Sequence, residues 1–193
     1  MVIDAKDIVI RFAGDSGDGM QLTGSLFADM SAIFGNSLST FPDYPAEIRA
    51  PHGTVSGVSG FQVHIGSEQI TTPGDFCDLL VAMNPAALKA NAKWLKRTAM
   101  VLLDSDTFDE DGLKRAALGD DPIAELHIED RVIIAAPITT LTSESLKDSG
   151  LDRKTIASAR ICLPSEWPAI YTTVRWNIYS NIWKESSEKR SLN

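Results

Sequence analysis

The chain has 193 residues, 44% of them hydrophobic and 23% charged, with a formal net charge of −8. These proportions are typical of a globular domain, and an acidic chain without a basic run is a poor ligand for nucleic acid or an anionic membrane. No apolar stretch reaches the ~20 residues that span a bilayer, and the first residues show no signal-peptide pattern. The two cysteines, Cys77 and Cys162, have neither CxxC nor metal spacing, so we expect a cytoplasmic protein without a disulfide framework.

The first predicted elements are a buried strand over 7–14, a glycine-rich turn and a helix over 18–35. Apolar residues recur at helical spacing in the helix, with Asp18 as its predicted N-cap and Gly35 as its stop. A second strand over 37–41 leads into a proline-stiffened loop over 42–53. The alternating residues of 54–74 predict an antiparallel hairpin that turns at Gly66.

Strands and helices alternate in the following part of the chain. Strands are predicted over 78–84, 98–104 and 131–137, and helices over 85–96, 109–118 and 142–150, the last with a serine or threonine cap and a helical continuation over 152–160. This order predicts an α/β fold, a layered Rossmann-like domain whose sheet is mostly parallel and carries an antiparallel hairpin.

The segment RFAGDSGDGMQLTG, residues 11–24, contains the Gly-Asp-Ser-Gly that surrounds the nucleophile of trypsin-like proteases. A serine nucleophile needs a base and a carboxylate that orients it. Ser16 precedes every histidine and stands near the start of an α/β chain, whereas the protease motif comes late in an all-β chain. We therefore reject the protease interpretation.

The same turn also resembles a phosphate cradle, because glycines let backbone N–H groups converge at a helix N-terminus. Two carboxylates flank it, however, and its G-x-x-G-x-G spacing differs from the dinucleotide fingerprint and lacks a P-loop lysine. A tight strand-to-helix turn and a weak ligand site remain equal alternatives. The candidate residues of this turn are Gly14, Asp15, Ser16, Gly17, Asp18 and Gly19.

Two further places carry candidate ligand-contacting residues. Glu47 and Arg49 stand in the loop YPAEIRAPHG, where prolines lower the entropic cost of holding charged side chains in place. The alternative for this pair is a solvated surface ion pair. Asn84 ends a predicted buried strand, so its amide either faces the crevice of the glycine turn or caps the next helix.

Three segments in this order and spacing resemble a known family: RFAGDSGDGMQLTG, STFPDYPAEIRAPHGTVSGVSGFQVHI and TPGDFCDLLVAMNPAALK. They are similar to the N-terminal, gamma-type domain of the alpha subunit of 2-oxoacid:ferredoxin oxidoreductases, most closely the 2-oxoglutarate type. The resemblance covers roughly residues 7–160. It places the glycine turn and the Glu47–Arg49 loop on the family's strongest motifs, as contacts for a ligand or another subunit.

The resemblance implies an oxidoreductase that converts a 2-oxoacid, CoA and oxidised ferredoxin into acyl-CoA, CO₂ and reduced ferredoxin. The complete enzyme uses thiamine diphosphate, Mg²⁺ and an iron–sulfur cluster, none of which this chain alone is expected to bind; its expected partner is a thiamine-binding beta subunit. We expect the chain to be incomplete and inactive alone, and no residue is assigned as catalytic. The alternative is a stand-alone α/β module that binds CoA or a nucleotide without redox chemistry.

The resemblance ends near residue 160, so we expect a gamma-type domain over 1–160 and an aberrant or disordered tail over 161–193. The tail has three of the four tryptophans, two prolines and no regular period. Codons permitted for Ala159–Pro168, started two nucleotides later, spell Lys-Asn-Leu-Phe-Ala-Leu-Gly-Met-Ala, and the continuation includes Tyr-Leu-Tyr-Asn-Arg-Pro. Both match the family, whose chain shows S-K-N-x-F-A-L-G and then Y-N-R-P. We therefore infer a frame change near codons 157–160; a divergent C-terminus is the alternative.

Overall fold

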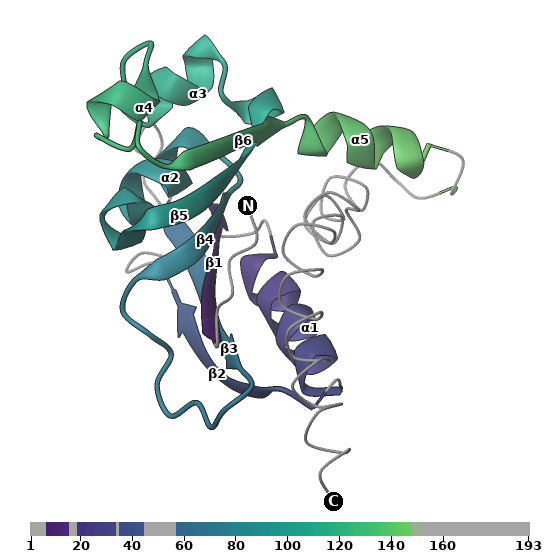
Figure 1. Ribbon diagram of the computed structural model, residues 1–193. Coiled ribbons are helices and arrows are strands. Elements are labelled where there is room, and N and C mark those ends of the chain that lie inside the picture. The colour runs from purple at the N-terminus through teal and green to yellow at the C-terminus, as the bar shows by residue number, and fades with distance from the viewer. Residues whose placement is uncertain (1–6, 16–18, 34, 45–56, 148–149, 151–193) are drawn as a thin grey trace, which may run out of the picture.

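The computed structural model describes residues 7–15, 19–33, 35–44, 57–147 and 150. They form one six-stranded sheet in the order β2-β3-β1-β4-β5-β6. Figure 1 shows α1 and α5 on one side of this sheet and α2, α3 and α4 on the other. The predicted α/β class, with a mostly parallel sheet and an antiparallel pair, is confirmed.

The parallel part of the sheet consists of four strands: β1 (Asp7–Asp15), β4 (Cys77–Ala82), β5 (Leu95–Asp104) and β6 (Val132–Ala136). The central strands β1 and β4 are mostly apolar and largely buried, as is typical of parallel strands covered on both faces. They agree with the four parallel strands expected from the sequence to within three residues at each end. β5 begins earlier than expected, because Leu95 already pairs with Cys77 of β4.

The antiparallel part of the sheet differs from the predicted hairpin. β3 (Val58–Gly66) runs antiparallel to β1 on one side and to β2 (Ser37–Asp43) on the other. The prediction of a second hairpin strand after Gly66 is wrong, because residues 67–76 form no strand. Instead, β2 is the antiparallel partner and the edge strand, and its Pro42 is tolerated because an edge position needs no second ladder hydrogen bond.

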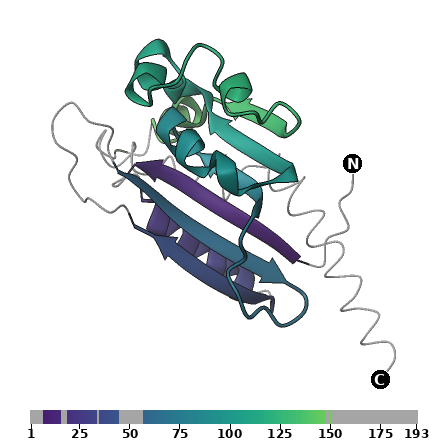
Figure 2. The same ribbon diagram turned by 90° about the vertical axis from the view of Figure 1, so that its left-hand side faces the viewer.

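Helix α1 (Met20–Ile33) covers one face of β1, β2 and β3, as Figures 1 and 2 show. Its buried residues recur every three or four positions, and Gly35, with φ +82°, ends the helix as expected. Gly24 lies directly on Phe61, where a Cβ atom would stand 2.0 Å from the Phe61 ring carbon Cδ1. Only glycine at this position allows such close contact between helix and sheet.

The remaining helices are shorter than the sequence pattern suggested. α2 (Pro85–Asn91) is followed by the 3-10 helix η1 (Ala92–Trp94), α3 is Glu110–Arg115, and α4 (Pro122–Glu125) was not predicted. Another 3-10 helix, η2 (Ser105–Thr107), follows β5. No helix of the described residues is long and apolar enough to cross a membrane.

Helix α5 (Ile138–Ser145) begins four residues before its predicted start, and the predicted serine or threonine cap is wrong. Its N-cap residue is Pro137, which makes no side-chain cap. Two carboxylates accept hydrogen bonds from the first amides instead: Asp104 Oδ1 from Thr139 N at 3.3 Å, and Asp106 Oδ2 from Thr140 N at 2.7 Å. Tertiary contacts therefore replace the local cap.

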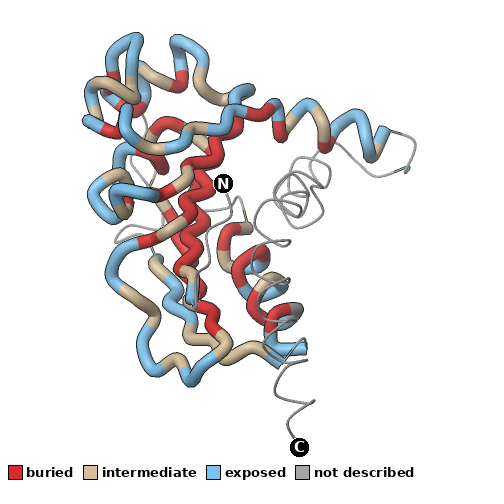
Figure 3. The backbone as a smooth tube through the Cα atoms, in the orientation of Figure 1, coloured by how far each residue is buried: buried red, intermediate tan, exposed pale blue. Residues whose placement is uncertain are grey.

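The core has two halves, one on each face of the sheet. Figure 3 shows that the buried residues are concentrated along the central strands. The half on the α1 face includes Ile10, Phe12, Phe61 and Leu102, and the half on the α2 face includes Val9, Leu80 and Leu88. Alternate residues of β1 belong to different halves, as the two-residue period of a strand requires. The predicted tail over 161–193 and the predicted helix over 152–160 lie outside the described residues.

Candidate functional site

The candidate site lies at the carboxyl ends of β1 and β4, which are adjacent parallel strands. After β1 the chain passes to α1 on one face of the sheet, and after β4 it passes to α2 on the other face (Figure 1). In open α/β sheets, ligands bind at this kind of switch point. The glycine turn and Asn84 follow these two strands, as the sequence led us to expect.

Asp15 and Asn84 meet at this edge. Asn84 Nδ2 donates to Asp15 Oδ1 at 2.8 Å, and Asn84 Oδ1 accepts from the backbone N–H of Ala87 at 2.8 Å. Asn84 is the N-cap of α2, which confirms the helix-cap alternative left open by the sequence, whereas a crevice-facing amide stays a prediction. The β1 and β4 backbones also join here, since Met83 N donates to Ala13 O at 2.9 Å.

The glycine turn is described only at its ends. Gly14 and Asp15 close β1, and Gly19 has φ +78°, a conformation that favours glycine before α1. The other candidates of the sequence analysis lie outside the described residues: Ser16, Gly17, Asp18, Glu47 and Arg49. The structure therefore brings Asp15, Gly19 and Asn84 to one end of the sheet and leaves the roles of all these residues as predictions.

Threonine hydroxyl groups link the end of β5 to the same edge of the sheet through hydrogen bonds. Thr107 Oγ1 donates to Met83 O at 2.8 Å, and Thr139 Oγ1 donates to Asp104 Oδ2 at 2.6 Å. Asp104 is fully buried, and three protein groups already donate to its carboxylate. It therefore organises the edge of the site and is not available to a ligand.

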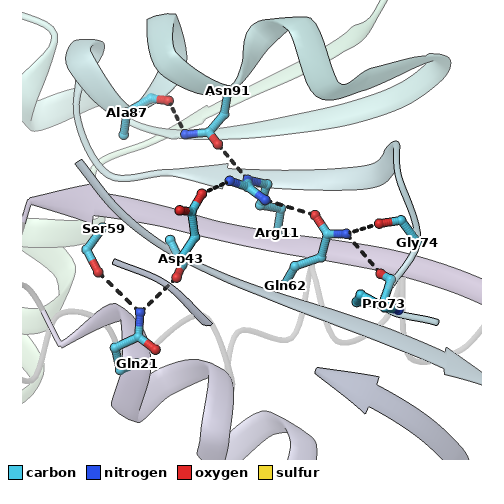
Figure 4. Close-up of polar contacts among 10 residues, drawn as sticks. Arg11, Gln21, Asp43, Ser59, Gln62, Pro73, Gly74, Ala87 and Asn91 are labelled. Atoms are coloured by element: carbon cyan, nitrogen blue, oxygen red, sulfur yellow. Dashed lines mark hydrogen bonds and ion pairs between the residues drawn. The ribbon is translucent and has the colours of Figure 1, made fainter. Parts of the chain in front are cut away.

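A buried polar network that the sequence analysis did not single out holds the neighbouring strands (Figure 4). Arg11, in the middle of β1, donates from Nε to Asn91 Oδ1 at 2.5 Å and from Nη1 to Gln62 Oε1 at 3.0 Å, and its Nη2 pairs with Asp43. Gln62 Nε2 in turn donates to the carbonyl oxygens of Pro73 and Gly74. An arginine inside the apolar run DIVIRFAG was the signal that could have revealed it.

This network positions the end of β2, from which the predicted Glu47–Arg49 loop continues. Arg11 is 7% exposed, and its partner Asp43 is the last residue of β2. Next to it, Gln21 of α1 donates through Nε2 to Gly60 O at 2.8 Å. The network therefore ties β1, β2, β3 and α2 together beside the candidate site.

The described residues offer no metal site. They contain no group of three or more His, Cys, Asp or Glu side chains that could hold an ion. Their one cysteine, Cys77, is fully buried; burial raises the pKa of its thiol to about 11, and its Sγ lies 3.4 Å from Trp94 O. A protonated, inaccessible thiol is not a metal ligand.

The class of protein follows from the sequence and the fold together. The model of the family "Pyruvate ferredoxin/flavodoxin oxidoreductase" matches residues 9–159. This match covers most of the chain, and the chain therefore belongs to that family.

Individual relatives indicate which members of this family the chain resembles. The chain is 49% identical over 149 residues to the 2-oxoglutarate oxidoreductase subunit KorA of Mycobacterium tuberculosis; the match covers 77% of this chain and 23% of KorA. The solved 2-oxoglutarate:ferredoxin oxidoreductase of Magnetococcus marinus, with 2-oxoglutarate, coenzyme A and succinyl-CoA bound, has a TM-score of 0.61 at 22% identity, over 94% of this chain and 28% of that one. Pyruvate oxidoreductase subunit PORC of Thermotoga maritima has a TM-score of 0.50 at 14% identity, and the match covers 83% of this chain and 95% of PORC. These two structures show the shared fold.

Proposed function

We propose that this chain supplies the gamma-type domain of a 2-oxoglutarate:ferredoxin oxidoreductase. The observation that carries the proposal is the 49% identity to KorA over 149 residues. The complete enzyme would oxidatively decarboxylate a 2-oxoacid, transfer the acyl group to CoA, and pass the electrons to ferredoxin. Because the chain spans less than a quarter of KorA, it would contribute one domain of such an enzyme and not the whole reaction.

The described residues do not fit the cofactors of that reaction. An iron–sulfur cluster needs several accessible thiolates, whereas these residues include only the buried Cys77. Magnesium bound to a diphosphate needs carboxylate or carbonyl oxygens in a group, and no suitable group occurs among the described side chains. Thiamine diphosphate, Mg²⁺ and the cluster would therefore be held by other domains or by a beta subunit.

We assign the edge of β1 and β4 to contact with those other domains or with CoA. The side-chain amide of Asn84 already has partners inside the domain: its Nδ2 donates to Asp15, and its Oδ1 accepts from Ala87 N. A phosphate placed at Asp15 would meet a carboxylate, which disfavours it without an intervening cation. Backbone groups of the glycine turn, Gly14 to Gly19, are better suited to a close approach by a ligand or another backbone.

Binding experiments separate this proposal from a stand-alone CoA- or nucleotide-binding module. Purified chain would be titrated with CoA by calorimetry, and with the thiamine-bearing partner of mycobacterial KorA by size-exclusion chromatography. A stable complex with that partner, with only weak binding of CoA by the chain alone, is the expected result. Tight CoA binding and no complex would instead identify the stand-alone module.

A further inference from the structure

The two described ends of the glycine turn belong to different elements and are held by different contacts. Asp15 ends β1; it pairs with Val58 of β3 and accepts a hydrogen bond from Asn84. Gly19, at the other end, precedes α1, and its carbonyl oxygen accepts from Thr23 N at 3.0 Å. The spacing of these two ends therefore depends on what holds the start of α1 against the end of β1.

One side chain from the first turn of α1 makes that link. Gln21 Nε2 donates to Gly60 O at 2.8 Å and to Ser59 Oγ at 3.3 Å (Figure 4). In the ladder between β1 and β3, Gly60 pairs with Ala13, and Ser59 pairs with Gly14. Gln21 therefore ties the start of the helix to the strand segment that lies beside the end of β1.

Close packing between α1 and β3 brings Gln21 within reach of this strand. Gly24 stands on the ring of Phe61, where a Cβ atom would lie 2.0 Å from Cδ1. Gln21 precedes Gly24 by three residues, so the two are neighbours on one side of the helix. Gly60 likewise precedes Phe61 in β3. The close approach that glycine permits at one position therefore allows a hydrogen bond one helical turn earlier.

Only the donor half of the Gln21 side chain has partners. Its Oε1 atom is buried, and no donor among the described residues bonds to it. A buried acceptor without a partner lowers stability, which offsets much of what the Nε2 hydrogen bonds add. Such a group in a folded protein calls for an explanation other than stability. The contacts of Gln21 therefore point to the geometry that they fix.

We propose that Gln21 is a positioning residue for the glycine turn. By holding α1 against β3, it sets the spacing between Asp15 and Gly19, and with it the shape of the edge that the thiamine-bearing partner contacts. A surface already held in its bound shape binds more tightly, because less ordering remains to be done on association. The positioning rests on the contacts of Gln21 alone, whereas the identity of the partner rests on the proposed function.

Gln21→Met tests the positioning in the 193-residue chain. Methionine has a similar length but neither donates nor accepts a hydrogen bond of comparable strength. Amide hydrogen exchange over residues 13–24 should become faster by about fivefold or more, as the loss of one hydrogen bond implies for local opening. Exchange over β4 should stay the same. Tm should change by less than about 2 °C, because the unpartnered acceptor is lost together with the donor.

The matched control is Gln69→Met. Gln69 is exposed and follows Gly66, at the opposite end of β3 from Gly60, so the same substitution removes no contact at the turn. Exchange over residues 13–24 should be as slow in this variant as in the parent chain. Unchanged exchange in Gln21→Met, or exchange that rises equally over the whole sheet, would overturn the positioning role.

A binding measurement tests the functional consequence. Kd for the thiamine-bearing partner of mycobacterial KorA should rise about tenfold in Gln21→Met, through lost preorganisation, and stay unchanged in Gln69→Met. An unchanged Kd beside faster local exchange would show that the turn is not the contact, and would overturn that half of the proposal. If the parent chain forms no complex at all, the proposed function fails instead, and hydrogen exchange alone still decides whether Gln21 positions the turn.

Discussion

Replacement of Arg11 by methionine tests the buried polar network beside the candidate site. Methionine fills a similar volume but donates no hydrogen bond, so Asn91 Oδ1, Gln62 Oε1 and the Asp43 carboxylate all lose their donor. Asn91 and Gln62 are each 3% exposed, so water cannot easily replace the lost donor. The substitution therefore orphans two buried acceptors and one carboxylate near the surface.

The expected loss of unfolding free energy in Arg11→Met follows from how far each of its three hydrogen-bond partners is buried. Each orphaned buried acceptor costs about 1–2 kcal/mol. The Asp43 side chain is 44% exposed, so its carboxylate rehydrates and adds at most about 1 kcal/mol. Loss of the desolvation cost of the guanidinium offsets part of this sum. Arg11→Met should therefore lower the free energy of unfolding by about 2–4 kcal/mol, which corresponds to about 5–15 °C in Tm.

Urea unfolding followed by circular dichroism measures this change in Arg11→Met, in Gln62→Leu and in the double variant. Because the two side chains share a hydrogen bond, the double variant should lose less than the sum of the two singles, by about 1 kcal/mol or more. Lys114→Met is the control, since Lys114 is 72% exposed in a surface pair and should change stability by less than about 0.5 kcal/mol. An Arg11→Met effect no larger than the control, or strict additivity, would refute the reasoning.

Three further substitutions or modifications test other parts of the account. Gly24→Ala should destabilise by about 1–3 kcal/mol in thermal unfolding despite alanine's higher helix propensity, because the added methyl group meets the Phe61 ring at 2.0 Å; a stabilised variant would contradict that packing. Asn84→Ala should lose about 1 kcal/mol through the cap to Ala87 N, whereas Asn84→Asp, which can keep this cap, should lose less; equal losses in both would argue against the cap. With the chain's other cysteine replaced by serine, Cys77 should react with iodoacetamide at pH 8 only after unfolding, because its thiol is buried and its pKa is raised to about 11; rapid labelling of the folded protein would contradict this.

The sequence predicted the parallel half of the fold because its strands are continuous apolar runs. Each of the strands β1, β4, β5 and β6 ends near a glycine, proline or polar residue that marks the boundary. The antiparallel half was harder to predict, because alternation in 54–74 shows that a strand exists but not which strand pairs with it. β3 pairs with β1 and β2 and not with the residues after Gly66, and only tertiary contacts decide that choice.

The candidate site was predictable in position but not in its contacts. Two strands that end in small or polar residues placed the glycine turn and Asn84 at one edge, because the carboxyl ends of parallel strands lie together. The hydrogen bond between Asn84 and Asp15 joins residues 69 apart in the chain, and no local pattern indicates it. The network of Arg11 and the carboxylate caps of α5 depend on such distant pairs as well.

The most direct test of the proposed function is the activity of a chimeric subunit. Residues 9–159 of this chain would replace the matching segment of mycobacterial KorA, and the assembled enzyme would be assayed for reduction of ferredoxin. The account predicts reduction that requires both 2-oxoglutarate and CoA, whereas this chain alone reduces nothing. A chimera that assembles with its partner and shows no 2-oxoglutarate-dependent reduction would contradict the assignment of this chain to a 2-oxoglutarate:ferredoxin oxidoreductase.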